Sequence, residues 1–203
     1  MSAGRGAKRL IVATRNAKKL RELKRYLKGL TIKLVSLNDI AGAPPIIEDG
    51  TTFRVNAIKK ALTISRFTDE LVLADDSGLA VDILKGDPGV RSSRYAGEDA
   101  LDHENNMKLL KSLEGVPLSR RKARFICHIA IADKGRLIRT IEQDCRGLIA
   151  FRVRGRSGFG YDPLFLIPKF NKTFGELGPR VKDRMSHRSK ALRQAVRFLK
   201  AYL

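Results

Sequence analysis

The chain lacks tryptophan altogether, and it has only two cysteines and three histidines among its 203 residues. The cysteines, Cys127 and Cys145, have no spacing typical of a metal site. The sequence therefore argues against a zinc module and against the disulfide framework of small secreted domains. Cys127 lies within an apolar run, which predicts a buried thiol. We expect a reduced, cytoplasmic protein.

Long apolar runs are also missing. No stretch approaches the ~20 residues that a membrane-spanning helix needs, so no membrane association is expected. Residues 1–9 are basic but lack the ~7–15-residue apolar core of a secretion signal, which predicts a flexible basic N-terminus and a chain that stays where it is made. With 43% hydrophobic and 31% charged residues, residues 1–203 are expected to form a single domain, built as two small lobes that share a core.

Acidic residues are scarce: there are 21 of them against 41 lysines and arginines, for a formal net charge of +20. Such a field attracts polyanions, either nucleotides or nucleic acid. The late bases fall largely opposite the apolar stripe of a predicted helix, where a solvated face is the ordinary explanation. No RNA-recognition aromatic signature and no zinc-finger spacing accompany the bases. The charge therefore predicts an anionic ligand, and nucleic acid is the less favoured one.

The order of the predicted elements is that of an α/β protein. Short apolar runs predict strands over 10–13, 31–35, 71–74 and 123–132, and an Asp133-Lys134-Gly135 turn leads to a hairpin strand over 137–141. Apolar residues at helical spacing predict helices over 20–30 with a stop at Gly29, over 56–67, over 99–113 and from Ser186 onward. We expect a mixed, twisted central sheet flanked by helices, with the active site in a cleft between two lobes.

Two adjacent carboxylates, Asp75 and Asp76, follow the buried run over 71–74, and Gly78 allows the chain to turn just beyond them. In α/β proteins, ligands bind at the carboxyl ends of buried strands. Two buried like charges repel each other, and Mg²⁺ or Mn²⁺ would relieve both the repulsion and the cost of burial. Glu48 offers a further ligand. The alternative is that one aspartate caps a turn while the other is solvated.

Three further loops carry groups suited to a nucleotide. Residues 14–19 place backbone N–H groups and two ammonium groups at a helix N-terminus, which favours phosphate; the alternative is ordinary capping by Thr14 or Asn16. Residues 157–163 hold two aromatic rings between glycines, which suits a stacked base, although such rings more often pack in a core. Residues 185–188 open the last helix with a histidine and a forked cation, where an anion or a carbonyl oxygen is favoured.

Taken in order, these segments resemble the inosine/xanthosine triphosphate pyrophosphatases, a family that removes nonstandard purine nucleotides from the precursor pool. The resemblance extends from Leu10 to about Leu199. Arg15, Ile47 and Ser189 depart from residues that are common in the family. The segments that carry the resemblance are Thr14 to Lys19, Asn56-Ala57 with Lys60-Ala61, Ala74 to Leu79 and on to Gly97, Gly158 to Pro163, and Ser186 to Arg188.

The resemblance implies a Mg²⁺-dependent hydrolase (Mn²⁺ being the other candidate ion) that converts ITP, dITP or XTP to the monophosphate and pyrophosphate, as a homodimer. It implies that Asp76 accepts the proton of the attacking water and binds the metal with Glu48, while Asp75 either holds Asp76 in place or supports the metal ligands from behind. The implied substrate-binding residues are Thr14, Arg15, Asn16, Ala17, Lys18 and Lys19 at the phosphates, Ser77 against the substrate, Phe159, Gly160, Tyr161 and Asp162 in the base pocket, and Lys182, His187 and Arg188 closing it.

Recognition of a 6-oxo purine has a direct rationale. A donor such as Arg188 or His187 can bond the 6-oxygen of hypoxanthine or xanthine, whereas the 6-amino group of adenine is itself a donor. A donor facing a donor leaves buried groups without partners, which costs ~1–3 kcal/mol per group.

Two other classes of function stay open. One is a related pyrophosphatase for modified pyrimidine nucleotides, which a panel of substrates would distinguish. The other is a non-catalytic protein that binds nucleic acid through its basic surface. Such a module has no need for Asp75 and Asp76, which would repel phosphate unless a metal were present.

Overall fold

A mixed sheet organises the molecule, and we describe it from a computed structural model over residues 9–28 and 30–203. The predictions for residues 1–8 and for a stop at Gly29 lie outside these residues. The strands are β1 (Arg9–Val12), β2 (Lys33–Ser36), β3 (Leu71–Val81), β4 (Lys122–Asp133), β5 (Arg136–Ile149), β6 (Phe165–Ile167) and β7 (Lys172–Thr173). The helices are α1 (Ala17–Leu27), α2 (Phe53–Thr68), α3 (Asp102–Ser112), α4 (Phe174–Met185) and α5 (His187–Tyr202).

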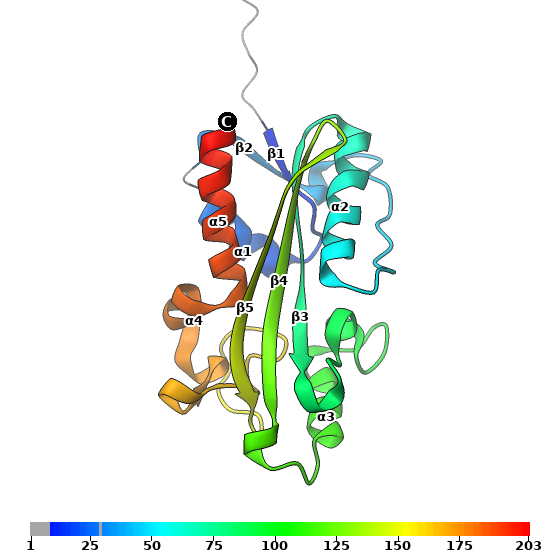
Figure 1. The fold of residues 1–203 in the computed structure, drawn as a ribbon. Helices are drawn as coiled ribbons and strands as arrows, with labels where there is room; N and C mark the ends of the chain where they lie inside the picture. The colour runs from blue at the N-terminus through cyan, green and yellow to red at the C-terminus, as the bar shows by residue number, and fades with distance from the viewer. Residues whose placement is uncertain (1–8, 29) are drawn as a thin grey trace, which may run out of the picture. The chain divides into compact units, whose positions relative to one another are not determined.

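The seven strands are hydrogen-bonded in the order β2-β1-β3-β4-β5-β6-β7, and Figure 1 labels β1 to β5. β1 pairs in parallel with β2 and β3, whereas β6 pairs antiparallel with β5 and β7. The sheet is therefore mixed, as the sequence predicts. The hairpin turn between β4 and β5 is also where it was predicted, with Lys134 at φ 48° and Gly135 at φ 72°, values typical of a tight hairpin turn.

The prediction that a strand ends at Ala74 and turns at Gly78 is wrong, because β3 continues through both aspartates to Val81. Leu79, Ala80 and Val81 are buried, so a second apolar run extends the strand. Gly78 is needed for space instead: a Cβ there would collide with the Ser92 hydroxyl. The carboxylates consequently lie within a strand rather than beyond its end.

The chain divides into two compact units. Among the described residues, unit 1 contains 9–28, 30–76, 128–142 and 191–203, and unit 2 contains 77–127 and 143–190. β3, β4 and β5 contribute residues to both.

In unit 1, the sheet is buried on both faces. Ala57, Ala61 and Ile64 of α2 pack on one face with Ile11 and Val72, among others. The alternate residues of the same strands point to the opposite face, and Figure 1 places α1 and α5 on the side of the strands away from α2. Full burial of each large aliphatic side chain contributes about 1.5–3 kcal/mol. Both faces are thus stabilised by helix packing.

In unit 2, aromatic rings fill the core. The ring centroids of Phe125 and Phe165 are 4.4 Å apart, and those of Phe165 and Phe174 are 5.5 Å apart. Leu109 of α3 and Tyr161 belong to the same cluster. This core holds α3 and the loop before β6 in one packed body, which bears on the site described below.

Sequence reasoning missed α4, β6 and β7, and it ended the β5 strand too early at residue 141. α4 contains Gly175, Gly178 and Pro179, and its backbone is kinked at Gly178, with φ 70°. These residues are ordinary turn formers, so they hide the helix from a pattern search. Within the described residues, no helix has the length and apolar content needed to cross a bilayer.

Candidate active site

Asp75 and Asp76 point to opposite faces of β3, because successive side chains in a strand alternate. On one face, Oδ2 of Asp75 is 3.4 Å from the Lys19 ammonium of α1. On the other, Oδ1 of Asp76 is 3.1 Å from the Lys60 ammonium of α2. Both carboxylates are buried, and a buried carboxylate needs a cationic partner. Each has its own lysine, so the two lysines balance the two negative charges.

Helix α2 also fixes the second predicted metal ligand. The Lys60 ammonium is 3.1 Å from Oε1 of Glu48 as well as from Asp76. One turn earlier, Oδ1 of Asn56 accepts a hydrogen bond from the Gly50 N–H at 2.8 Å. Residues four apart lie on one side of a helix, so Asn56 and Lys60 together hold the segment 48–50 close to Asp76.

The environment of this cluster changes the proton affinities of its members. Burial raises the pKa of Asp76 above the ordinary range of an aspartate, and this outweighs the lowering by Lys60 and Lys19. Burial alone would lower the pKa of Lys60, but the carboxylates of Asp76, Glu48 and Asp75 outweigh it and raise that pKa. Lys60 therefore stays cationic at neutral pH, and Asp76 holds a proton more readily than a surface aspartate, which suits a general base.

The residues present fit a divalent cation. Oδ2 of Asp76 is buried and accepts no hydrogen bond from the part of the chain that is described, and Glu48 lies across the same lysine. Those residues contain no cluster of three acidic, histidine or cysteine ligands. Mg²⁺ is commonly held by one or two carboxylates together with water and substrate phosphates, so a third side chain is not required.

The loop between β1 and α1 is capped from within. Oδ1 of Asn16 accepts hydrogen bonds from the N–H groups of Lys18 at 2.9 Å and Lys19 at 3.1 Å. The Thr14 hydroxyl accepts one from the Asn16 N–H at 3.2 Å. The capping alternative therefore describes Asn16. Arg15, Asn16, Ala17 and Lys18 are nevertheless exposed, and Lys19 reaches from this helix start to Asp75.

In unit 2, the loop over residues 158–162 is folded around the Asp162 carboxylate. Its Oδ2 accepts a hydrogen bond from the Phe159 N–H at 2.9 Å and another from the Lys182 ammonium of α4. A Cβ at Gly158, which has a φ of +84°, would collide with this carboxylate, so only glycine fits there. The Lys182 nitrogen lies 4.6 Å from the centroid of the Phe159 ring, within cation–π range.

The two aromatic residues of this loop differ in role. Tyr161 is buried in the unit 2 core and donates a hydrogen bond from its hydroxyl to the Ser92 carbonyl at 2.9 Å. Burial also raises its pKa. The core-packing alternative therefore describes Tyr161. Phe159 is only half-buried and stands next to Lys182, so it is the ring suited to a base.

The start of α5 brings the remaining predicted residues together. Arg188 donates a hydrogen bond from Nη2 to the Ser77 hydroxyl at 2.6 Å, and its guanidinium carbon lies 5.5 Å from the Phe159 centroid. His187 is buried, with its ring stacked on Phe125 at 4.9 Å. Ser77, Phe159, Lys182 and Arg188 are thus gathered in unit 2.

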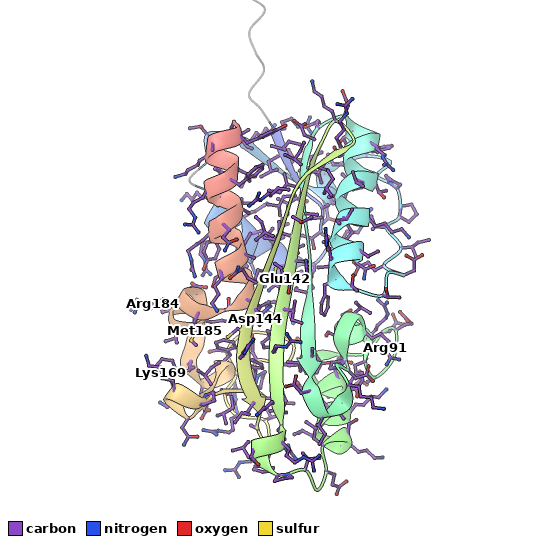
Figure 2. The ribbon with its side chains drawn as sticks, in the orientation of Figure 1. Arg91, Glu142, Asp144, Lys169, Arg184 and Met185 are labelled. Carbon is purple, nitrogen blue, oxygen red and sulfur yellow. The ribbon has the colours of Figure 1, made fainter. Side chains whose placement is uncertain are left out.

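Sequence reasoning gave no role to Lys60, although a signal existed. Lys60 occupies the stripe of α2 that Ala57, Ala61 and Ile64 bury, and a lysine in a buried stripe needs an acidic partner. It likewise missed His128 on β4, whose Nε2 is 2.9 Å from Oε2 of Glu142, labelled on β5 in Figure 2.

The fold and these side chains define an α/β protein whose buried carboxylates and lysines suit phosphate and divalent-cation chemistry. Residues 10–198 match the model of the Ham1 family, and the chain belongs to this family. Relatives named dITP/XTP pyrophosphatase, from Desulforamulus reducens and Rhodopirellula baltica, are each 51% identical, covering 94% and 91% of this chain and 95% and 89% of theirs. A HAM1 protein structure from Coxiella burnetii matches with a TM-score of 0.88 at 39% identity, covering 96% of this chain and 99% of that one. The predicted family resemblance and the α/β fold are confirmed.

Proposed function

We propose that the protein hydrolyses nonstandard purine nucleoside triphosphates (dITP, XTP and ITP) to the nucleoside monophosphate and pyrophosphate. The observation that carries the proposal is the buried Asp76 carboxylate, which has one oxygen on Lys60 and the other without a hydrogen bond among the described residues. The relatives named dITP/XTP pyrophosphatase support the choice of substrate.

Unit 1 supplies the groups that the chemistry at phosphorus needs. Water attacks the α-phosphorus and pyrophosphate leaves, so catalysis consists mainly of positioning and charge neutralisation. Asp76 accepts the proton of the attacking water. Lys19 and the loop over residues 14–18, most of which is exposed, hold the phosphates, and Asp75 keeps the Lys19 side chain in place.

Asp76 and Glu48 would hold a divalent cation, Mg²⁺ or Mn²⁺. When bound, the cation would neutralise negative charge on the phosphates. Lys60 would balance the same two carboxylates when no cation is present, because its ammonium is 3.1 Å from each of them.

Unit 2 supplies the groups that recognise the base. The half-buried ring of Phe159 suits stacking, and Lys182 and Arg188 are donors beside that ring. Donors at this place favour the 6-oxygen of hypoxanthine or xanthine over the 6-amino group of adenine. Ser77 orients Arg188 and contacts the substrate, and His187 completes the pocket. The expected homodimer, cleft and cytoplasmic location stay predictions.

The test is product analysis with dITP, XTP, dATP and a modified pyrimidine triphosphate, with Mg²⁺ and with EDTA. We expect dIMP and pyrophosphate from dITP, turnover of XTP, little from dATP or the pyrimidine, and none in EDTA. Release of dIDP and orthophosphate would contradict attack at the α-phosphorus. A preference for the modified pyrimidine would favour the other class of pyrophosphatase.

A further inference from the structure

Two side chains on one face of α3 form hydrogen bonds with the loop over residues 158–162. Oδ2 of Asp102 accepts a hydrogen bond from the Gly160 N–H at 3.0 Å. One turn later, Nδ2 of Asn106 donates a hydrogen bond to the Gly160 carbonyl at 3.0 Å. Because residues four apart lie on the same side of a helix, α3 binds both backbone groups of a single residue.

These hydrogen bonds matter because Gly160 has a backbone conformation that few other residues adopt. Its φ of +61° lies in the left-handed region, yet a Cβ there would meet nothing within 4 Å. Glycine is needed at this position for its backbone angle and not for space. The hydrogen bonds from Asp102 and Asn106 hold the residue in that conformation from outside the loop.

The burial of Asn106 indicates a positioning role. The residue is 5% exposed, and its Oδ1 is buried without a hydrogen-bond partner among the described residues. A half-satisfied buried amide is less favourable for folding than an apolar side chain of similar size. Packing alone would therefore favour leucine at this position, and the benefit of the amide is the hydrogen bond to Gly160.

Gly160 lies between Phe159 and Tyr161, and these two neighbours have different contacts. Tyr161 is fixed in the unit 2 core by its bond to Ser92. Phe159 carries the half-buried ring beside the Lys182 ammonium and the Arg188 guanidinium. A shift of the Gly160 peptide would move Phe159 relative to these two cations, and hydrogen-bond recognition tolerates shifts of only ~0.5 Å.

We propose that Asp102 and Asn106 are positioning residues for base discrimination, because they fix the Phe159–Asp162 loop against the donors that read the 6-oxygen. This inference rests on the proposed function. It predicts that removing either hydrogen bond to Gly160 changes the preference between bases. The binding of the triphosphate should not change, since the residues proposed to hold the phosphates belong to unit 1.

The experiment compares Asp102→Ala, Asp102→Asn and Asn106→Leu, with His103→Ala as the control on the same helix. The Asn variant removes the charge of Asp102 but keeps a side-chain oxygen that can accept from Gly160, so it serves as a rescue of the Ala variant. For each protein we would measure kcat/KM with dITP and dATP, the inhibition constant of tripolyphosphate and the thermal midpoint.

We expect Asp102→Ala and Asn106→Leu to lower the dITP/dATP ratio of kcat/KM by ~5–30-fold, the effect of one lost hydrogen bond, with no change in tripolyphosphate inhibition. Asp102→Asn and His103→Ala should retain the parent ratio. An unchanged ratio in folded variants, or equal losses for both substrates with a lower thermal midpoint, would overturn the inference. A parent protein that releases no pyrophosphate from dITP would instead overturn the proposed function itself.

Discussion

Asp75 and Asp76 are neighbours in the chain but have separate partners in space. The alternation of side chains along β3 directs Asp75 to Lys19 and Asp76 to Lys60. From the sequence, a divalent cation appeared as the simplest way to relieve their repulsion. The structure adds that two lysines already do this. The cation is therefore proposed for chemistry at the phosphates and is not needed to keep the carboxylates apart.

Replacement of Asp76 by asparagine tests its role as the base. The amide keeps the shape of the side chain but neither accepts the proton of water nor provides an anionic ligand. We expect turnover of dITP to fall by at least ~10²–10⁴-fold while the circular dichroism spectrum stays unchanged. Asp82→Asn, an exposed aspartate just after β3, is the matched control and should keep full activity. Near-normal activity of Asp76→Asn would contradict the mechanism.

Lys60 and Lys59 form a matched pair for stability. The side chains of Lys60 and Asp76 are 6% and 7% exposed, so Lys60→Met leaves a buried carboxylate without its cation. We expect a loss of ~3–5 kcal/mol in the free energy of unfolding in urea. The pair formed by Lys59 and Asp49 has exposures of 40% and 63%, so Lys59→Met should leave the free energy of unfolding nearly unchanged. Equal losses would mean that burial does not govern the Lys60 pairs.

At the scale of elements, the same arrangement of two polar side chains occurs on α2 and on α3. Asn56 and Lys60 of α2 hold the segment 48–50, and Asp102 and Asn106 of α3 hold Gly160. In each case two polar residues four apart bind a loop that carries site residues. Periodicity in the sequence finds the helices, because it reports which face is apolar. It does not reveal the loop that the polar face binds.

Features with a local signal in the sequence could be predicted, whereas contacts between distant residues could not. The strand at residues 71–74 and the hairpin turn at Lys134-Gly135 have local signals, and the structure contains both. The continuation of β3 follows from the second apolar run over 79–81, which the aspartates separate from the first. The close approach of Ser92 to Gly78 comes from a distant segment. The contact between Asp102 and Gly160 joins residues 58 positions apart, and no local pattern encodes it. The motif residues could be predicted individually, whereas their pairing with Lys60, Asn56 and α3 could not.

The first turns of α1 and α5 are proposed to perform different tasks, which two variants can separate. Lys19 should contribute equally for every purine, because a triphosphate is the same whatever base it carries. Lys19→Ala should therefore weaken dITP and dATP alike. Arg188→Ala removes a donor beside Phe159 and should lower the dITP/dATP ratio of kcat/KM by ~10–150-fold, the effect of one charge-assisted bond. Equal losses for both substrates with Arg188→Ala would make Arg188 a phosphate contact.

At the scale of the whole molecule, the positive charge is distributed and belongs to no single site. Exposed bases occur on α1, on α5 and throughout unit 2, where Arg91, Lys169 and Arg184 of α4 are examples labelled in Figure 2. A net charge of +20 raises the local concentration of any anion, including a nucleotide, and its effect weakens with salt. The charge would favour capture of the proposed nucleotide substrate, and the proposed specificity would come from the buried groups described above.

Cooperativity between the two units can be measured through the two cysteines. Cys127 on β4 and Cys145 on β5 are 0% and 4% exposed, so both thiols are buried, where the sequence indicated only Cys127. Burial raises the pKa of Cys145 to about 11, and the thiolate is the reactive form. Both cysteines belong to strands that contribute residues to unit 1 and unit 2. Both residues fall in the parts of these strands that belong to unit 2, so their reactivity reports opening of that part of the sheet.

We expect the native protein to react negligibly with a disulfide reagent at pH 8. After unfolding, the two cysteines should react and release two equivalents of thiol from the reagent. Along a urea series, thiol reactivity and circular dichroism should change together, because strands common to both units couple their unfolding. The unfolded protein in urea serves as the control for reagent activity. A thiol that reacts before the loss of secondary structure would mean that β4 and β5 open while one unit remains folded, and that the units unfold independently.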